Sequence, residues 1–378
     1  MPTPPKILAE AYEGWLDAQR KALELMTSLE QPGTDQDWAE GYRWLTRMAS
    51  LCQDWVLEKE DPLRPTIFRN QDEYRKLIVD NPDVNYWFAS VKPEHAYRLS
   101  GNKGGAPYLG FTIGTDVIRG TPGKTGTLAQ HYIDQFEVAP NGDFEIVAAG
   151  ARPAGHEGNF MALPEGTAQI AVRETFTNRK TQRPATLRIE RLGEKAKPPR
   201  AEPEVVAEKL RAMSRYLLVI AHTCAMLWKS SAANTNRLVG VAGAQHVKKQ
   251  ENEVNTHSDT DMVYMGGKFA LEEGQALRIT MHKPPYPFVY WGLVLVNPWM
   301  ESFDFRYTTT HLSNGTAVPD ANGDWTLVVA PEHPGPNVRN WLDAGGRREG
   351  FLLLRWVLAG DAPPQPSCAV VPLASLRG

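Results

Sequence analysis

Two series of short β-type runs, divided by one long helical stretch, constrain the fold of this chain more than any other feature. Each run is rich in β-branched or aromatic residues and ends at a Gly, Pro or Asn-Gly turn. Strands that follow one another without an intervening helix favour antiparallel sandwiches or barrels over a parallel sheet. The predicted strands are 97–100, 108–113, 131–138, 144–148, 169–176 and 185–192, then 262–265, 268–271, 276–281, 288–296, 303–310, 325–330 and 351–358.

Two of these runs, 288–296 and 351–358, are almost continuously apolar, which is typical of strands covered on both faces. The run 303–307 alternates instead, with Phe303 and Tyr307 on one side and Arg306 on the other. The sequence therefore predicts both fully buried and half-buried strands.

Helical periodicity covers residues 7–29, the Trp-rich stretch that follows Pro32, a short segment at 71–80, and 204–230. We therefore predict a mainly β (α+β) protein with two antiparallel β-sandwich-like units. The expected divisions are an N-terminal helical region (1–84), a first β unit (85–200), a connecting helix and loop (201–245) and a C-terminal sandwich (246–378).

The composition excludes several classes of protein. A net charge of −3 over 378 residues gives no basic surface for nucleic acid. No apolar run approaches the roughly 20 residues needed to cross a bilayer, and the first residues lack the apolar core of a secretory signal. The three cysteines show no metal spacing. We expect a soluble, cytoplasmic protein with a small-molecule substrate; a homo-oligomer is left open.

The segment 255–261 is the strongest candidate for chemistry. If it is extended, His257, Asp259 and Asp261 point to the same side. A histidine between carboxylates is a tunable general base, and a solvated acidic loop is the competing interpretation. We predict His257 as the base, oriented by Asp259 or Asp261.

Arg306 and Arg355 lie inside apolar runs and therefore need partners. Each is interpreted either as half of a structural ion pair with Asp304, Asp343 or Glu349, or as a fork for a substrate oxyanion. Tyr307 and His311 could supply a proton donor and a substrate contact beside Arg306. The further predicted substrate-binding residues are Trp291, Trp299, Trp341 and Arg355.

Four short stretches near the C-terminus resemble the bacterial domain-of-unknown-function family twelve-fourteen. They are Tyr290-Trp291-Gly292-Leu293, Asn297-Pro298-Trp299, Asn340-Trp341-Leu342 and Leu354-Arg355-Trp356-Val357. The preceding β unit is similar to the family's companion region, the twelve-fifty-four family. The resemblance implies an antiparallel β fold and supplies no activity. The family's longer members are associated with bacteria that degrade steroids and lignin-derived aromatics. The resemblance therefore favours a ring-bearing substrate.

The leading hypothesis is a cofactor-independent lyase that acts by general acid/base catalysis on a hydroxylated aromatic compound, such as a lignin-derived phenolic. A glycan-processing or glycan-binding sandwich is one alternative. A non-haem iron oxygenase is another, with His257, Asp259 and a distal histidine, His282 or His311, as ligands. Residues 312–324 contain no Arg or Lys, which argues against a 2-oxoglutarate enzyme. No metal or other cofactor is expected.

Overall fold

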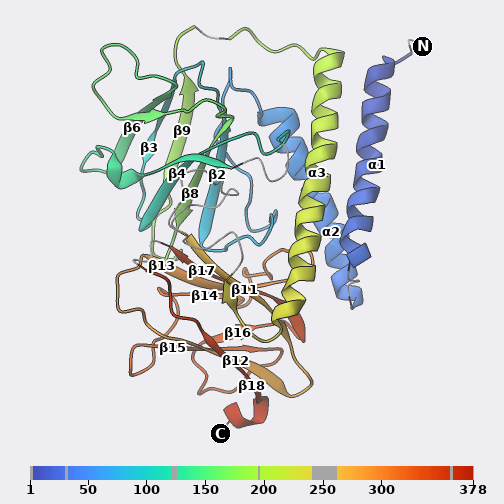
Figure 1. Cartoon of the computed structure of the whole chain (residues 1–378), viewed down its shortest axis with the longest axis vertical. Coiled ribbons are helices and arrows are strands. Elements are labelled where there is room, and N and C mark those ends of the chain that lie inside the picture. Colours follow the sequence, from blue (N-terminus) through green and yellow to red (C-terminus); the bar gives the residue numbers. More distant parts are fainter. Residues whose placement is uncertain are drawn as a thin grey trace.

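The computed structural model describes residues 3–29, 33–120, 126–194, 196–240, 262–357 and 361–377. Within them the chain forms two β-sandwiches, one above the other in Figure 1, with long helices along one side. The predicted fold class is confirmed: the protein is mainly β, with an N-terminal helical region and a helix that connects the two sandwiches. His257, Asp259 and Asp261 lie outside the described residues.

The first sandwich pairs a five-stranded sheet, in the order β1-β2-β8-β4-β5, with a four-stranded sheet, in the order β7-β6-β3-β9. Neighbouring strands are antiparallel except β6 and β7, which are parallel. Its strands are β1 (Phe68–Arg69), β2 (Val84–Ser90), β3 (Tyr97–Asn102), β4 (Tyr108–Gly114), β5 (Thr127–Tyr132), β6 (Asp143–Ala149), β7 (Phe160–Ala162), β8 (Gln169–Thr175) and β9 (Thr186–Arg191). A 3-10 turn, η2 (Ile133–Gln135), follows β5.

The second sandwich repeats this plan, with sheets in the orders β10-β11-β17-β13-β14 and β16-β15-β12-β18. The short edge strand β16 pairs in parallel with β15. Its strands are β10 (Val239–Gly240), β11 (Met262–Ala270), β12 (Gln275–Met281), β13 (Tyr290–Val296), β14 (His311–Ser313), β15 (Trp325–Ala330), β16 (Trp341–Asp343), β17 (Glu349–Val357) and β18 (Ser367–Pro372). The 3-10 turn η4 (Leu373–Leu376) follows the last strand.

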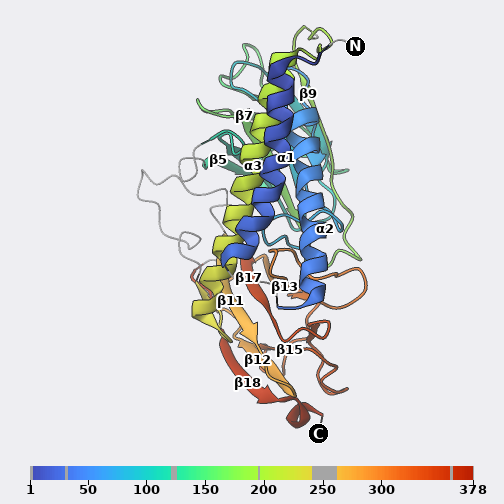
Figure 2. The ribbon, with the colours of Figure 1, turned by 90° about the vertical axis from the view of Figure 1, so that its right-hand side faces the viewer.

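The helices α1 (Lys6–Leu29) and α3 (Pro203–Ser231) lie side by side along the first sandwich, and α3 continues to the second, as Figures 1 and 2 show. Proline at the first position of α3 is favourable there because its missing N–H has no partner in a helix. Thr34 caps α2 (Asp35–Cys52) by accepting a hydrogen bond from the Asp37 N–H. α2 continues as a π-helical segment, η1 (Gln53–Lys59), and α3 as the 3-10 turn η3 (Ala232–Asn234).

Apolar side chains fill each sandwich and a third core beside them. Phe111 and Val172 lie in the first interior, and Trp291 and Trp356 lie in the second. The third core joins the helices to the outer faces of both five-stranded sheets. The strands β13 and β17 are therefore buried on both faces, as the continuous apolar runs predicted.

The two five-stranded sheets also meet each other. Tyr108 of β4 packs with Tyr290 of β13 and Val357 of β17. A Cβ on Gly292 would lie 1.8 Å from the Tyr290 hydroxyl, and a Cβ on Gly110 would lie 2.4 Å from that of Tyr108. Glycine at these positions therefore lets each tyrosine fold back over its own strand in the layer between the sandwiches.

Three predicted elements are wrong. Residues 71–80 form no helix, because Ile78 and Val79 adopt positive φ values of 40° and 56°. Residues 303–310 form a turn rather than a strand, and the Asp304 carboxylate accepts from the backbone N–H of Arg306 at 3.3 Å. The strand predicted at 131–138 ends at Tyr132, where η2 begins.

Among the described residues, no helix combines the length and the apolar character needed to cross a bilayer.

Candidate ligand-binding site

A cavity of about 340 Å³ opens where the two sandwiches and the segment between β1 and β2 meet. This volume lies at the small end of the range for small-molecule sites, roughly 300–1,000 Å³. Aromatic rings, three arginines and several carboxylates line it. The lining residues are Arg69, Gln71, Asp72, Glu73, Tyr74, Asp80, Asn81, Pro82, Val84, Tyr86, Arg179, Phe305 and Arg306.

Strained backbone lies beside this cavity. β-branched residues rarely adopt positive φ, and both Ile78 and Val79 do so. Two contacts hold this turn: the Val79 N–H donates to the Met300 carbonyl at 2.7 Å, and the Arg355 guanidinium donates to the Val79 carbonyl. Ligand sites frequently contain strained backbone that is held in place by contacts with distant residues.

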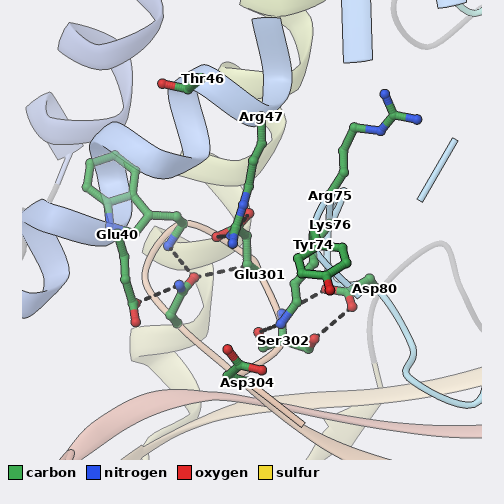
Figure 3. Close-up of polar contacts among 12 residues, drawn as sticks. Glu40, Thr46, Arg47, Tyr74, Arg75, Lys76, Asp80, Glu301, Ser302 and Asp304 are labelled. Carbon is green, nitrogen blue, oxygen red and sulfur yellow. Dashed lines mark hydrogen bonds and ion pairs between the residues drawn. The ribbon is translucent and has the colours of Figure 1, made fainter. Parts of the chain in front are cut away.

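Buried charges fix the same segment to the loop after β13, and fix that loop to α2 (Figure 3). Lys76 Nζ donates to the carbonyls of Ser302 and Phe303 at 2.5 and 3.0 Å. The Asp80 carboxylate accepts from the Ser302 N–H and hydroxyl at 2.8 and 2.7 Å. Arg47 of α2 contacts both oxygens of Glu301 at 2.8 Å. Nearly every polar group in this network has a partner, so the segment is held in one position.

Burial shifts the proton affinities of this network. It raises the pKa of Glu301 to about 7, although the nearby Arg47 and Lys76 oppose the change. It lowers the pKa of Lys76, against the attraction of Asp80 and Glu301. Glu301 therefore titrates near neutral pH inside the protein.

A histidine–aspartate pair lies directly behind the cavity. His311 Nε2 is 3.2 Å from the Asp83 carboxylate, which also accepts from the Tyr290 hydroxyl at 3.0 Å. The ring of Phe305, a cavity wall, packs edge-on against the imidazole at 5.8 Å. Burial, and then the Asp83 charge, raises the pKa of Tyr290 well above its usual value. Asp83 therefore holds the imidazole through Nε2, and the other ring nitrogen, Nδ1, is buried without a hydrogen-bond partner.

The structure brings three of the predicted site residues to the cavity or beside it. Arg306 lines the cavity and forms a forked ion pair with Asp304 at 2.6 and 2.8 Å, one of the structural partners expected for it. His311 lies behind Phe305, and Arg355 supports the strained turn at Val79. Tyr307 is adjacent to Arg306 but is 79% exposed.

The three predicted tryptophans lie elsewhere. Trp291 is fully buried inside the second sandwich against Trp325. Trp299 is buried against Trp44 of α2, and its indole N–H donates to the Asp37 carbonyl at 2.7 Å. Trp341, on edge strand β16, packs against His333. Their rings act as packing anchors in this structure, and Tyr74, Tyr86 and Phe305 provide the aromatic lining of the cavity.

Sequence reasoning missed Arg69, Arg179 and Asp83. The available signal was the Asn81-Pro82-Asp83 turn, which concentrates polar side chains immediately before a β-type run. That signal would have marked the segment but not its partners, because His311 is 228 positions from Asp83.

Among the described residues, no group of three or more histidine, cysteine, aspartate or glutamate side chains could hold a metal ion. The described cysteines are free, and burial strongly raises the pKa of Cys52 and Cys224, so neither is poised as a thiolate. A second hollow, beside Arg152 and Phe160, is lined by polar groups that bond to one another. The cavity between the sandwiches is the stronger candidate.

Comparison with known proteins gives a family for the last third of the chain. Residues 264–360 match a family described as "Protein of unknown function (DUF1214)". The predicted resemblance to this family is confirmed over those residues. They run from β11 to just beyond β17 and so include His311, Arg306 and Arg355 but none of the cavity residues of the first sandwich.

Solved structures extend the likeness to nearly the whole chain. An uncharacterised protein from Burkholderia cenocepacia superposes with a TM-score of 0.89 at 28% identity, covering 98% of this chain and 99% of its own. A protein from Vibrio parahaemolyticus has a TM-score of 0.52 at 10% identity, covering 93% and 100%, and shows the fold alone. No functionally curated protein matches the chain.

Proposed function

We propose that this protein is a cofactor-independent enzyme of the lyase class, which converts a hydroxylated, ring-bearing small molecule by general acid/base catalysis. Elimination or carbon–carbon cleavage is the proposed reaction. The observation that carries the proposal is the cavity between the sandwiches, which combines aromatic walls with convergent guanidinium groups beside strained, tightly held backbone.

The cavity suits a ring-bearing molecule. Tyr74, Tyr86 and Phe305 offer ring faces and edges for stacking. The Arg306 guanidinium, held by Asp304, is a fixed donor for an oxygen that gains negative charge during reaction. Tyr307 adjoins it on the solvent side as the proposed proton donor.

Two histidines are proposed as acid/base groups. His257, assisted by Asp259 or Asp261, remains the proposed general base; these three lie outside the described residues. His311 is the second, because Asp83 already orients its imidazole behind Phe305. General-base catalysis by a positioned histidine typically contributes about 10²–10⁴-fold to rate.

The test is turnover of a panel of phenolic, steroid and sugar compounds without added cofactor, followed by mass spectrometry. Conversion of a phenolic compound by the wild type, reduced about 10²–10⁴-fold in His257→Ala, supports the proposal. His282→Ala is the matched control, because His282 is an exposed histidine paired with Asp324. Full activity in His257→Ala removes that residue from the mechanism, and absence of any conversion by the wild type contradicts the lyase proposal.

A further inference from the structure

Two arginines of the first sandwich line the cavity and form no ion pair with any described residue. Arg69 ends strand β1, and Arg179 lies in the turn that follows β8. Both line the cavity. Burial lowers the pKa of Arg179, and the positive charge of Arg69 acts in the same direction, whereas the negative charges of Asp83, Glu174 and Glu73 oppose the change.

The hydrogen bonds of Arg179 are made to neutral groups. Its Nε donates to the Pro82 carbonyl at 2.8 Å, and its Nη1 donates to the Asn85 side-chain oxygen at 2.9 Å. Within the described part of the chain, neither Arg69 nor Arg179 forms an ion pair, and Arg69 Nε is buried without a hydrogen-bond partner. Two other arginines of the layer are paired, Arg47 with Glu301 and Arg306 with Asp304, whereas Arg355 forms no ion pair with a described residue and its Nη1 is buried without a hydrogen-bond partner.

The carboxylates around these two arginines bond to other groups. Asp83, whose charge acts most strongly on Arg179, accepts from the Tyr290 hydroxyl at 3.0 Å and lies 3.2 Å from His311 Nε2. One oxygen of Glu174 accepts from the Ala185 N–H at 2.5 Å and the other from the Asn85 amide at 2.7 Å. Asp80 is bonded to Ser302, and Asp72 accepts from its own turn at the Tyr74 N–H. Glu73 attracts Arg179 without forming an ion pair with it in the described structure.

Nearby carboxylates offset part of the cost of burying these two guanidinium groups, but among the described residues none of them forms an ion pair with either group. An anion that bonds to the guanidinium groups directly therefore adds stabilisation. A carboxylate matches the planar fork of a guanidinium and accepts two parallel hydrogen bonds from it. The aromatic side chains line the same cavity as the two arginines, so one molecule that carries a ring and a carboxylate can contact both.

We propose that Arg69 and Arg179 form a carboxylate-binding subsite, so that the ligand of the cavity is an aromatic carboxylic acid whose ring packs on Tyr74, Tyr86 and Phe305. This proposal specifies the substrate class of the proposed enzyme. It rests on the proposed function, because that function assigns the cavity as the substrate site. In this arrangement Arg306, which belongs to the second sandwich, contacts the oxygen that gains charge during the reaction.

The test is isothermal titration calorimetry of the full chain with para-hydroxybenzoate and with its neutral analogue para-hydroxybenzamide. The wild type is expected to bind the acid at least about tenfold more tightly than the amide, because hydrogen bonds to a charged acceptor are the stronger ones. Arg69→Met and Arg179→Gln are each expected to remove most of that difference, because they weaken binding of the charged acid more than binding of the neutral amide. Arg188→Met is the control, because Arg188 is an exposed arginine of β9 paired with Glu190.

Each outcome of the titration either supports the carboxylate subsite or overturns it. Equal affinity for acid and amide in the wild type overturns the carboxylate subsite and leaves the lyase proposal standing. Preference for the acid that survives both substitutions overturns it as well, and so does failure of both compounds to bind. If the acid binds in an arginine-dependent way but no phenolic acid is turned over, the result supports the subsite and contradicts the lyase proposal. A thermal scan of each variant confirms that it is folded.

Discussion

The interiors of the two sandwiches and the layer between them are built on different principles. Inside each sandwich the side chains are almost entirely apolar, as around Phe111 in one and Trp291 in the other. The layer between them holds Lys76, Glu301 and Arg355, all buried, together with backbone in unfavourable conformations. Apolar packing stabilises the sandwich interiors, whereas polar contacts between segments far apart in the sequence determine the backbone conformation of the layer. Binding sites are regions of the same kind as the layer, because they need polar groups held in fixed positions.

The largest effect is expected from removing a ring from a sandwich interior. Trp291 is fully buried and packs against Trp325 and Trp356. Trp291→Ala should lower the free energy of unfolding by about 3–5 kcal/mol through lost burial and the cavity that remains. Urea denaturation measures this. A variant of normal stability that loses ligand affinity would instead make Trp291 part of the binding site.

A pH-dependent effect is expected in the layer. The pKa of Glu301 is raised to about 7 in the folded protein, from 4.5, so the folded state holds this proton more tightly than the unfolded state does. Its contribution is therefore most favourable below about pH 4.5 and is lost as the pH rises toward about 7, at roughly 1.4 kcal/mol per unit.

Glu301→Gln should remove this part of the pH dependence, measured by urea denaturation at several pH values across that window. Glu273→Gln is the control, because Glu273 is 85% exposed and paired with Arg348. Identical pH profiles for Glu301→Gln and the wild type would mean that Glu301 is not the group that titrates in the layer.

A smaller effect is expected where a strand of the second sandwich borders the layer. In Gly292→Ala the new methyl group would overlap the Tyr290 hydroxyl, which is bonded to Asn81 and Asp83. Displacing this buried ring should cost about 1–3 kcal/mol and release His311 from its oriented position. The control is Gly14→Ala in α1, where no atom lies within 4 Å and alanine should stabilise the helix by about 0.5–1 kcal/mol. Loss of stability of equal size in both variants would remove the special role of Gly292.

The smallest effect is expected at Tyr307. Its side chain is 79% exposed and touches Arg306 only through its ring. Tyr307→Ala should change the free energy of unfolding by less than about 0.5 kcal/mol. A larger loss of stability would show that this tyrosine belongs to the layer rather than to the surface; its proposed role as a proton donor is tested separately by turnover.

The contrast between the two regions also explains what the sequence could predict. Strands β13 and β17 and helix α3 follow from local patterns of apolar residues, and their predicted positions agree closely with the structure. The segment 71–80 could not be predicted, because its conformation depends on Arg355 and Met300, far along the chain. For the site, the sequence identified Arg306, His311 and Arg355 as unusual polar residues. It provided no means of pairing His311 with Asp83 or of placing Arg69 and Arg179 in one cavity.

The most direct test of the central claim, that the cavity between the sandwiches is the functional site, is a crystal structure of the protein with bound para-hydroxybenzoate. We predict the ring between Tyr74, Tyr86 and Phe305, with its carboxylate on Arg69 and Arg179. A ligand bound instead in the polar hollow beside Arg152 and Phe160, with the cavity between the sandwiches containing only solvent, would contradict the claim.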